Sequence, residues 1–390
     1  MITEKLFNCD AYETAFAAEV LECVENAAGY GIVLNKTLFY PEGGGQPADT
    51  GTLVFDSEIY NVTDVKETGG KIVHTVNAAL PTGASVTGKI DWERRFSLMQ
   101  QHTGEHIVSG IIKNKYKYDN VGFHIGTGDV TIDFNGVLAE DDLIYIEEQA
   151  NKAVYENIRI TTDYPPPDIL AGLNYRSKIS LTDGIRIVTV PGYDTCACCG
   201  THCKATGEVG IIKILGSIKY KNGVRISLLC GVRALRDYAS KNNQIYSISG
   251  LLSAKPEDVY SAVARLKNEN GLLSKTLSES KNELYKLKCE SVPEGSPHAV
   301  MFENGASNDD LRRFCLLLSE RAATSAVFSE NGDGTYKYAI GSLTRDVRAL
   351  SKELCGRFGG KGGGQPALVS GTLDRSATRA ALEDFIKCQN

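Results

Sequence analysis

The sequence predicts an α+β protein of four consecutive parts. Three patterns lead to this prediction: short β-type runs fill residues 1–90, helix and strand patterns mix in residues 91–242, and a helical repeat precedes a last α/β segment. The helical repeat belongs to residues 243–292 and the last segment to residues 293–390. A chain of 390 residues can hold several domains with separate cores, and a hydrophobic content of 42% is ordinary for a globular protein.

Residues 1–90 are predicted to form a small β-barrel. Short runs rich in β-branched and aromatic residues alternate there with turns that contain Gly, Pro or Asp. The runs begin at Gly31, Thr37, Gly51, Glu58 and Lys71.

Residues 91–242 are predicted to form an α+β domain that carries two metal-type signatures. The pattern indicates a helix over 95–114, strands within 121–134, a helix over 140–157 and further strands up to Leu229. Both signatures, described next, lie inside this part.

The two signatures are His102-Thr-Gly-Glu-His106 and Cys198-Cys-Gly-Thr-His202. Histidines four residues apart on a helix lie on one face, so His102 and His106 can bind one ion together. The second signature follows Pro191-Gly192 and is predicted to be a loop. Three imidazoles and one thiolate suit tetrahedral Zn²⁺, which is the predicted cofactor.

The residues around the two signatures leave a Cys-x-x-Cys site open as an alternative and argue against a zinc protease. Cys196 and Cys199 form a Cys-x-x-Cys pair, which is typical of redox or structural zinc sites, although a four-cysteine ribbon would need a second such pair. The zinc-protease helix requires a glutamate directly after the first histidine, but Thr103 occupies that position here and Glu105 comes two residues later. A protease of that type is therefore disfavoured.

Residues 243–292 are predicted to be a helical coiled-coil connector. Pro256 opens the helix, and apolar residues then recur at steps of four and three, which is the 3.5-residue seam of a coiled coil. A homodimer through this seam or through the last part is possible. Residues 293–390 alternate strand and helix patterns and predict a small α/β domain.

Charge is distributed unevenly along the chain, whose net charge is −6. Residues 1–72 carry four Lys or Arg against twelve Asp or Glu, whereas residues 203–236 carry seven against Glu208 alone. Basic residues near tyrosines suit contacts to phosphates and bases, although a solvated lysine-rich face is the alternative. No signal peptide or apolar membrane span is evident, so a cytoplasmic protein with reduced cysteines is expected.

The hexapeptide Gly-Gly-Gly-Gln-Pro-Ala occurs at 43–48 and again at 362–367. Glycines at this density permit close approach of the backbone to a ligand, or serve a turn alone. Gly359-Gly-Lys-Gly before the second copy is not a phosphate-binding Walker loop, because Cys355 replaces its first glycine and Gly362 its Ser or Thr.

These motifs, in this order, resemble the free-standing alanyl-tRNA editing proteins of the AlaX type, relatives of the editing half of alanyl-tRNA synthetase. The resemblance rests on Phe39-Tyr-Pro-Glu-Gly-Gly-Gly-Gln46, the two metal signatures and Thr206-Gly-Glu208, and it spans nearly the whole chain. The tail from Phe358 to Gly364 is similar to the C-terminal domain shared with alanyl-tRNA synthetases and DHH phosphoesterases. The chain has no Asp-His-His run, so phosphoesterase chemistry is not expected.

The resemblance implies a hydrolase that removes serine from mischarged tRNA(Ala), with glycine as a second candidate amino acid and with zinc held by His102, His106, Cys198 and His202. The usual Cys-Gly-Gly-Thr-His has Cys199 in place of its first glycine here, which makes Cys199 or Cys196 a possible substitute ligand. No aminoacylation is implied, because the chain begins at the editing-type barrel.

Within this hypothesis, Thr103 is the candidate catalytic residue. Candidate substrate contacts are Gly43, Gly44, Gly45 and Gln46. Candidate contacts to the tRNA body are the basic residues Lys113, Lys213, Lys219, Arg225, Arg357 and Lys361.

Two other function classes remain open from the sequence. A non-catalytic tRNA-binding protein would use the same four ligands to hold a structural zinc. A small-molecule zinc hydrolase would show no dependence on tRNA or on salt.

Overall fold

The computed structural model describes residues 2–177, 184–374 and 377–389. The chain divides into two compact units, Met1–Ile245 and Tyr246–Asn390, and the division falls inside α4 (Gly231–Leu252). In the described part, no helix combines the length and apolar character needed to cross a membrane.

The first unit begins with a closed six-stranded barrel, as the sequence predicts. The strand order around the barrel is β2-β3-β7-β6-β5-β8. Its core contains side chains such as Val20, Leu34 and Leu53, which are fully buried. The strands are β2 (Ala15–Asn26), β3 (Gly29–Leu34), β5 (Gly51–Phe55), β6 (Glu58–Thr68), β7 (Lys71–Val76) and β8 (Ser85–Ile90), and a short parallel pair joins β1 (Glu4–Lys5) to β4 (Lys36–Thr37).

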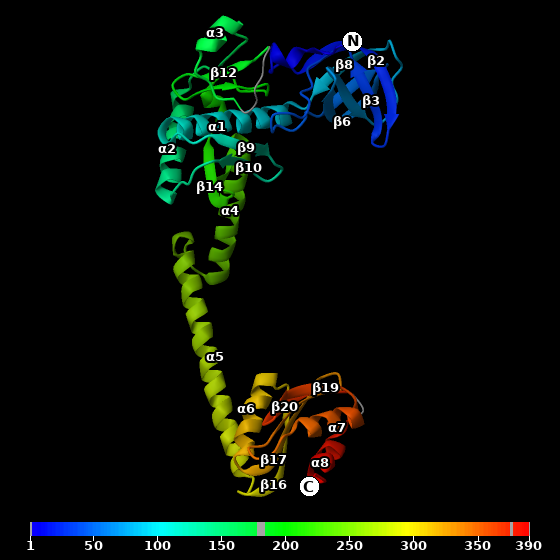
Figure 1. Cartoon of the computed structure of the whole chain (residues 1–390), viewed down its shortest axis with the longest axis vertical. Helices are drawn as coiled ribbons and strands as arrows, with labels where there is room; N and C mark the ends of the chain where they lie inside the picture. The colour runs from blue at the N-terminus through cyan, green and yellow to red at the C-terminus, as the bar shows by residue number, and fades with distance from the viewer. Residues whose placement is uncertain (1, 178–183, 375–376, 390) are drawn as a thin grey trace. The chain divides into compact units, whose positions relative to one another are not determined.

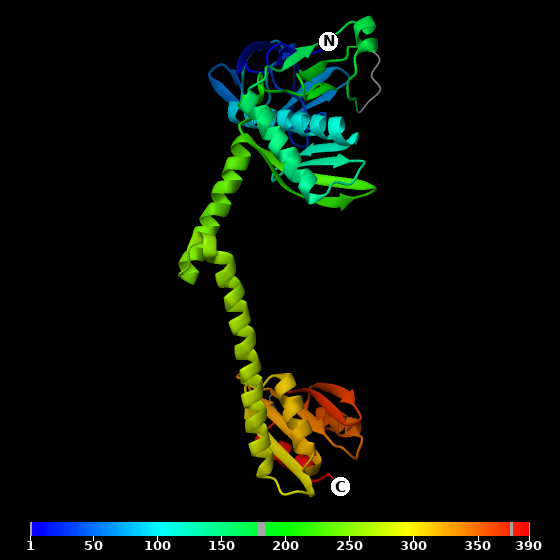
Figure 2. The ribbon, with the colours of Figure 1, turned by 90° about the vertical axis from the view of Figure 1, so that its left-hand side faces the viewer.

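The rest of the first unit is an α+β domain built around α1 (Trp92–Tyr116). This helix runs between a three-stranded and a four-stranded sheet (Figure 1), and α2 (Glu140–Glu156) packs with it on the larger sheet (Figure 2). The four-stranded sheet has the order β14 (Ile212–Tyr220), β15 (Gly223–Cys230), β10 (Val130–Phe134) and β9 (Asn120–Ile125). The three-stranded sheet consists of β11 (Thr161–Asp163), β12 (Ile187–Val190) and β13 (Asp194–Ala197), with α3 (Pro167–Gly172) and the 3₁₀ turn η2 (Thr206–Val209) nearby in sequence.

A fully buried ion pair joins the barrel to α1. The guanidinium of Arg95 binds the carboxylate of Asp49, and neither side chain is exposed to solvent. The same guanidinium donates to the backbone oxygens of Leu38 at 2.6 Å and Ala11 at 2.9 Å. Because every contact of Arg95 crosses between barrel and helix, the pair fixes the direction in which α1 leaves the barrel.

The second unit is a five-stranded sheet covered by helices on both faces. Successive residues of β17 (Ala322–Glu330) and β18 (Tyr336–Gly341) point to alternate sides. Phe328 and Tyr338 pack with α7 (Arg348–Phe358) and α8 (Arg379–Lys387), whereas Val327 and Ala339 pack with α6 (Asn308–Ser319) and the end of α5 (Val259–Glu290). The sheet is completed by β16 (Ser296–Asn304), β20 (Leu368–Leu373) and the edge strand β19 (Lys361–Gln365), and the 3₁₀ turn η3 (Pro256–Asp258) precedes α5.

The predicted connector is helical, but its seam has no partner within the described chain. In α5, Leu273 is 70% exposed and Leu277 is 58% exposed. A coiled coil through this seam therefore stays a prediction.

The two copies of Gly-Gly-Gly-Gln-Pro-Ala have different structures. The first lies in a loop of the barrel, while the glycines of the second form the exposed edge strand β19. The hexapeptide alone therefore does not determine the backbone conformation, which depends on the surrounding tertiary contacts.

Candidate metal centre

Helix α1 brings the two histidines of the first signature together. Asp91 caps its N-terminus by accepting a hydrogen bond from the backbone amide of Arg94 at 3.1 Å. One helical turn separates His102 and His106, and their ring centroids lie 5.3 Å apart. Both side chains are 2% exposed, so they face the interior of the domain.

The loop after β13 brings Cys198 and His202 to the same place. Arg186 holds this loop by donating to the backbone oxygens of Cys198 at 3.0 Å and Gly200 at 2.9 Å. A Cβ atom at Gly200 would lie 2.2 Å from Cε1 of His102. Only glycine therefore allows the loop to approach the α1 histidine this closely.

The four predicted donors converge on one point. The Cys198 Sγ lies 3.3 Å from Nε2 of His102 and 3.4 Å from Nε2 of His202. His106 supplies the fourth ligand atom, and all four atoms lie within 4.8 Å of one another. Tetrahedral zinc with Zn–S of about 2.3 Å and Zn–N of about 2.0 Å would separate sulfur and nitrogen ligands by about 3.5 Å. The geometry of the cluster fits that ion.

The other ring nitrogens of the α1 histidines are held by side chains. Nδ1 of His102 lies 2.8 Å from Oε1 of Gln46, and Nδ1 of His106 lies 3.0 Å from Oδ2 of Asp194. Gln46 is fully buried, and its Nε2 donates to Oγ1 of Thr201 at 2.9 Å. Such acceptors fix the proton on Nδ1 and direct Nε2 to the metal position, as is typical of protein zinc sites.

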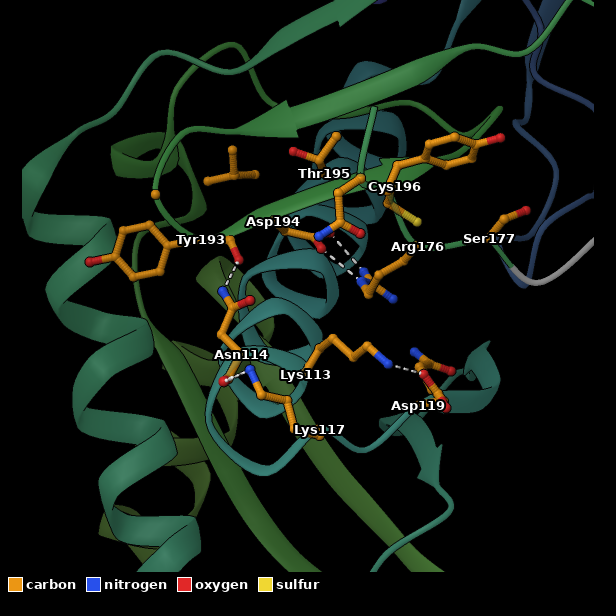
Figure 3. Close-up of a pocket in the computed structure, with 15 residues that line it drawn as sticks. Lys113, Asn114, Lys117, Asp119, Arg176, Ser177, Tyr193, Asp194, Thr195 and Cys196 are labelled. Atoms are coloured by element: carbon orange, nitrogen blue, oxygen red, sulfur yellow. Dashed lines mark hydrogen bonds and ion pairs between the residues drawn. The ribbon is translucent and has the colours of Figure 1, made fainter. Parts of the chain in front are cut away.

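Asp194 is itself anchored by Arg176. The guanidinium forms two hydrogen bonds of 2.7 Å to the carboxylate. Burial alone would raise the pKa of Asp194, but hydrogen bonds from Arg176 and His106 lower it to about 2. Asp194 and Arg176 line a cavity of about 660 Å³, which is also lined by the Lys113–Asp119 ion pair (Figure 3). Arg176 and Cys196 also line a smaller cavity beside the four metal donors.

The electrostatics distinguish Cys198 from the cysteines beside it. Burial alone would raise the pKa of the Cys198 thiol, but the charges of His102 and His202 hold it well below its ordinary value. Burial raises the pKa of Cys196 to about 11 and also raises the pKa of Cys199. Because zinc binds the thiolate, Cys198 is the best suited of the three as a ligand.

A cavity of about 290 Å³ opens beside the cluster. This volume is at the lower end of the roughly 300–1,000 Å³ that small-molecule sites occupy. Among its described lining residues, Glu105 supplies the only carboxylate, and its Oε2 lies 3.8 Å from Nε2 of His106. Its Oε1 accepts hydrogen bonds from Ser109 at 2.6 Å and Asn120 at 2.5 Å, which fix the carboxylate in this orientation.

The glycine-rich loop reaches this cavity from the barrel. The amide of Ile125 donates to the backbone oxygen of Gly45 at 2.9 Å, and a Cβ atom at Gly45 would lie 2.5 Å from the oxygen of Phe123. Gly45 has φ of +84°, which favours glycine. Gly44 lines the cavity, while Gly43 accepts a hydrogen bond from the Tyr40 hydroxyl at 3.0 Å.

Thr103 lies away from the cavity wall. It is fully buried, and its Oγ1 accepts a hydrogen bond from the amide of Cys203 at 3.0 Å. Thr103 therefore supports the loop that carries His202.

The predicted tRNA contacts in the first unit mostly have acidic partners. Lys113 pairs with Asp119 at 2.5 Å, Lys213 with Glu147 at 2.6 Å and Arg225 with Asp133 at 2.6 Å. Lys219 is exposed on β14. In the second unit, Arg357 and Lys361 are exposed on α7 and β19.

Sequence reasoning missed the residues that orient the ligands. Asp194, Arg176 and Arg186 lie outside both signatures, and only Asp194, four residues before Cys198, is close to one of them. An acidic residue next to a metal signature is only a weak sequence signal for a hydrogen-bond partner of a histidine ligand. Gln46, which contacts Nδ1 of His102, was predicted to contact the substrate instead.

Comparison with known proteins agrees with these motifs. Residues 6–94 match the family model described as tRNA synthetases class II (A), and residues 185–227 match the threonyl and alanyl tRNA synthetase second additional domain. The C-Ala domain of Aquifex aeolicus alanyl-tRNA synthetase covers 24% of the chain at 16% identity with a TM-score of 0.21, and 94% of that domain is matched. The two family models both match segments of the first unit.

Three relatives define the relationship further. The alanine–tRNA ligase of Ignicoccus hospitalis is 35% identical over 72% of this chain and 32% of its own length, and that of Haloquadratum walsbyi is 32% identical over 98% of this chain and 43% of its own length. The chain thus spans less than half of the ligases it matches. The alanyl-tRNA editing protein AlaX-L of Pyrococcus horikoshii is 30% identical over 96% of this chain and 95% of its own length. The chain belongs to this family of alanyl-tRNA editing proteins.

Proposed function

We propose that the protein hydrolyses the ester bond of tRNA(Ala) mischarged with serine, and also with glycine, in the cytoplasm. The observation that carries this proposal is the cluster of His102, His106, Cys198 and His202 beside a cavity that admits a small aminoacyl group. The relative from Pyrococcus horikoshii, which matches almost end to end, is named an alanyl-tRNA editing protein.

Zinc bound by the four donors would supply a Lewis acid that polarises the ester or a water molecule. Glu105 is placed to accept the proton that the attacking water loses, because its carboxylate lines the same cavity. Gln46 and Asp194 hold the imidazoles in place, and Thr103 supports the His202 loop. Gly44 of the glycine-rich loop lines the same cavity and would contact the substrate.

Discrimination of serine from alanine has to use the serine hydroxyl. A pocket with a fixed hydrogen-bonding group for that hydroxyl leaves the group unpaired when alanine binds, which costs binding energy. Binding of the tRNA body falls to exposed basic residues such as Lys219, and in the second unit to Arg357 and Lys361.

One observation favours a second candidate, a non-catalytic tRNA-binding protein with a structural zinc. Four protein ligands complete a tetrahedral shell, and catalytic zinc sites generally keep one position open. Catalysis would then require an expanded shell, a ligand that dissociates, or a terminal ribose hydroxyl that helps to move the proton.

The test is the deacylation rate of seryl-tRNA(Ala) by zinc-loaded protein. Glycyl-tRNA(Ala) and alanyl-tRNA(Ala) serve as comparison substrates, and His106→Ala and Glu105→Gln as variants. We expect rapid release of serine that spares alanine, is lost in His106→Ala and falls by roughly 100-fold or more in Glu105→Gln. No release above spontaneous hydrolysis, from folded and zinc-loaded protein, would overturn the enzymatic proposal in favour of the RNA-binding one.

A further inference from the structure

A third cavity borders β9, the strand that also borders the metal cavity. Phe123 lines the metal cavity, whereas the next two residues of the strand, His124 and Ile125, line this one. The glycine-rich loop also reaches both, with Gly44 on the metal side and Pro47 on this side. The volume of this cavity is about 590 Å³.

Three arginines line this cavity: Arg94, Arg233 and Arg236, which we call the arginine cluster. Arg94 donates to the backbone oxygen of Ala48 at 3.0 Å, and Arg233 donates to that of Gly126 at 2.9 Å. Both acceptors are uncharged. In the described part of the chain, no carboxylate forms an ion pair with any of the three guanidinium groups.

The position of the cluster makes its positive charge more costly. Arg94 lies in the first turn of α1 and Arg233 in the first turn of α4, and a helix N-terminus already carries partial positive charge. The first turn of α1 contains Glu93, whereas the first turn of α4 contains no acidic residue. Asp237, which also lines the cavity, is paired with Lys241 at 2.7 Å. Burial and the charge of Arg94 lower the pKa of Arg233.

The cavity near Asp194 provides an internal contrast. Of its cationic side chains, Lys113 pairs with Asp119 and Arg176 pairs with Asp194, while Lys117 donates to the backbone oxygen of Asn114 at 2.8 Å. None of the three arginines of the cluster has an ion-pair partner in the described part of the chain, and positive charge of this kind binds an anion favourably.

We propose that the arginine cluster binds a backbone phosphate of the RNA strand whose 3′ end enters the metal cavity. The inference rests on the proposed function for the identity of that RNA. Guanidinium groups donate two parallel hydrogen bonds to phosphate oxygens, and the adjoining helix N-termini stabilise the same charge. A strand held there would be positioned by the same glycine-rich loop and the same strand β9 that line the metal cavity.

The experiment measures binding of uncharged tRNA(Ala) to the full chain across a series of salt concentrations. Arg236→Gln is the main variant, because Arg236 is exposed and its replacement is expected to leave the fold intact. We expect binding to weaken by roughly three- to tenfold, and the slope of log K against log salt to fall by about one. Arg233→Gln should act in the same direction, and Arg236→Lys, which keeps the charge, should retain the slope.

Arg159→Gln is the matched control, since it removes an exposed arginine of the first unit that lies outside the cavity. An equal effect in this control, or an unchanged slope in both cluster variants, would overturn the proposal. Inorganic phosphate distinguishes an RNA phosphate from a free anion as the ligand of the cluster. If phosphate binds the native chain but the variants bind tRNA unchanged, the cluster is a free-anion site, and this result also overturns the proposal.

The binding assay uses uncharged tRNA, so it does not depend on hydrolysis. Loss of binding in the variants without any deacylase activity in the native chain would leave the phosphate site standing and remove the editing function. If Arg236→Gln and Arg233→Gln deacylate seryl-tRNA(Ala) with unchanged KM, the editing function stands and the phosphate site is removed.

Discussion

In each α1 histidine, Nδ1 contacts a buried acceptor, which leaves Nε2 available to the candidate metal position. For His102 that acceptor is Gln46, whose Oε1 also accepts from the amide of Thr201 at 3.2 Å. Gln46 thereby couples the α1 ligand to the loop that carries His202. A change at Gln46 should consequently affect the metal before it affects substrate binding.

We predict that Gln46→Ala lowers zinc affinity by roughly 10- to 100-fold, because His102 loses the acceptor that orients its ring. Competition with a chromophoric chelator measures the affinity. Gln46→Glu, which keeps an oxygen at the same position, should retain most of it. Unchanged zinc affinity in Gln46→Ala, with a raised KM for seryl-tRNA(Ala), would instead make Gln46 a substrate contact.

A buried histidine outside the metal cluster affects stability at acid pH. His74 is fully buried in the barrel, where Nε2 accepts from Thr37 at 2.8 Å and Nδ1 donates to the oxygen of Ile32 at 3.0 Å. Burial lowers its pKa to about 4, so both hydrogen bonds belong to the neutral ring. In the unfolded chain the pKa is about 6.5, hence the unfolded state binds more protons between these values.

Stability should therefore be complete above about pH 6.5 and fall by about 3 kcal/mol as the pH drops to 4. Urea unfolding followed by the fluorescence of Trp92, the single tryptophan, measures this at pH 7 and 4.5. His74→Gln should lower the free energy of unfolding at both pH values but remove this titration. The difference in pH dependence between the native protein and the variant therefore gives the contribution of His74. Parallel pH profiles would contradict the assignment.

At the scale of elements, the glycine-rich loop is held against β9 at one residue. A Cβ atom at Gly45 would meet the backbone of Phe123, whereas the nearest atom to a Cβ at Gly43 is the Tyr40 hydroxyl oxygen at 3.6 Å. Gly45→Ala should cost about 1–3 kcal/mol of unfolding free energy and displace the loop from the metal cavity. Gly43→Ala should be nearly neutral. Urea unfolding compares the two, and equal stability would mean that the loop is free to shift.

The exposed seam of α5 makes a second prediction at this scale. A 32-residue helix with leucines exposed at a 3.5-residue spacing can bury them against a second copy of itself. We expect dimers at tens of micromolar protein in sedimentation experiments, and monomers when Leu273 and Leu277 are both changed to Glu. Lys275→Glu, on the opposite face, should leave the dimer intact. A native protein that is monomeric at every concentration would show that the seam has another role.

Local patterns in the sequence predicted the barrel and the helices α1 and α2, because these elements show clear periodicity. The strand β2 was missed: Phe16, Ala18 and Val20 alternate as a strand requires, but alanine and glutamate between them favour helix. The four metal donors were predicted from spacing. Asp194 was not recognised as the partner of His106 because the two are 88 residues apart, and only the tertiary fold brings them together.

At the scale of the molecule, all four candidate metal donors belong to the first unit, and none of them is among the buried residues of its two hydrophobic cores, although Cys198 packs against one core. One core lies inside the barrel and the other between α1, α2 and the four-stranded sheet. The segments that carry the ligands are also joined by contacts that need no metal, such as the hydrogen bonds of Arg186 to the Cys198 loop. The first unit should therefore stay folded when zinc is removed, unlike a small zinc finger.

We predict that dialysis against a chelator abolishes deacylation while the far-ultraviolet circular dichroism spectrum is retained. The thermal midpoint should fall, since zinc at a thousand times its Kd adds about 4 kcal/mol to the stability of the folded state. Hydrogen exchange should increase mainly in the loop from Cys198 to His202, and added zinc should restore both protection and activity. If the whole first unit unfolds instead, the ion is a structural element of the fold, and the RNA-binding function becomes the better account of the chain.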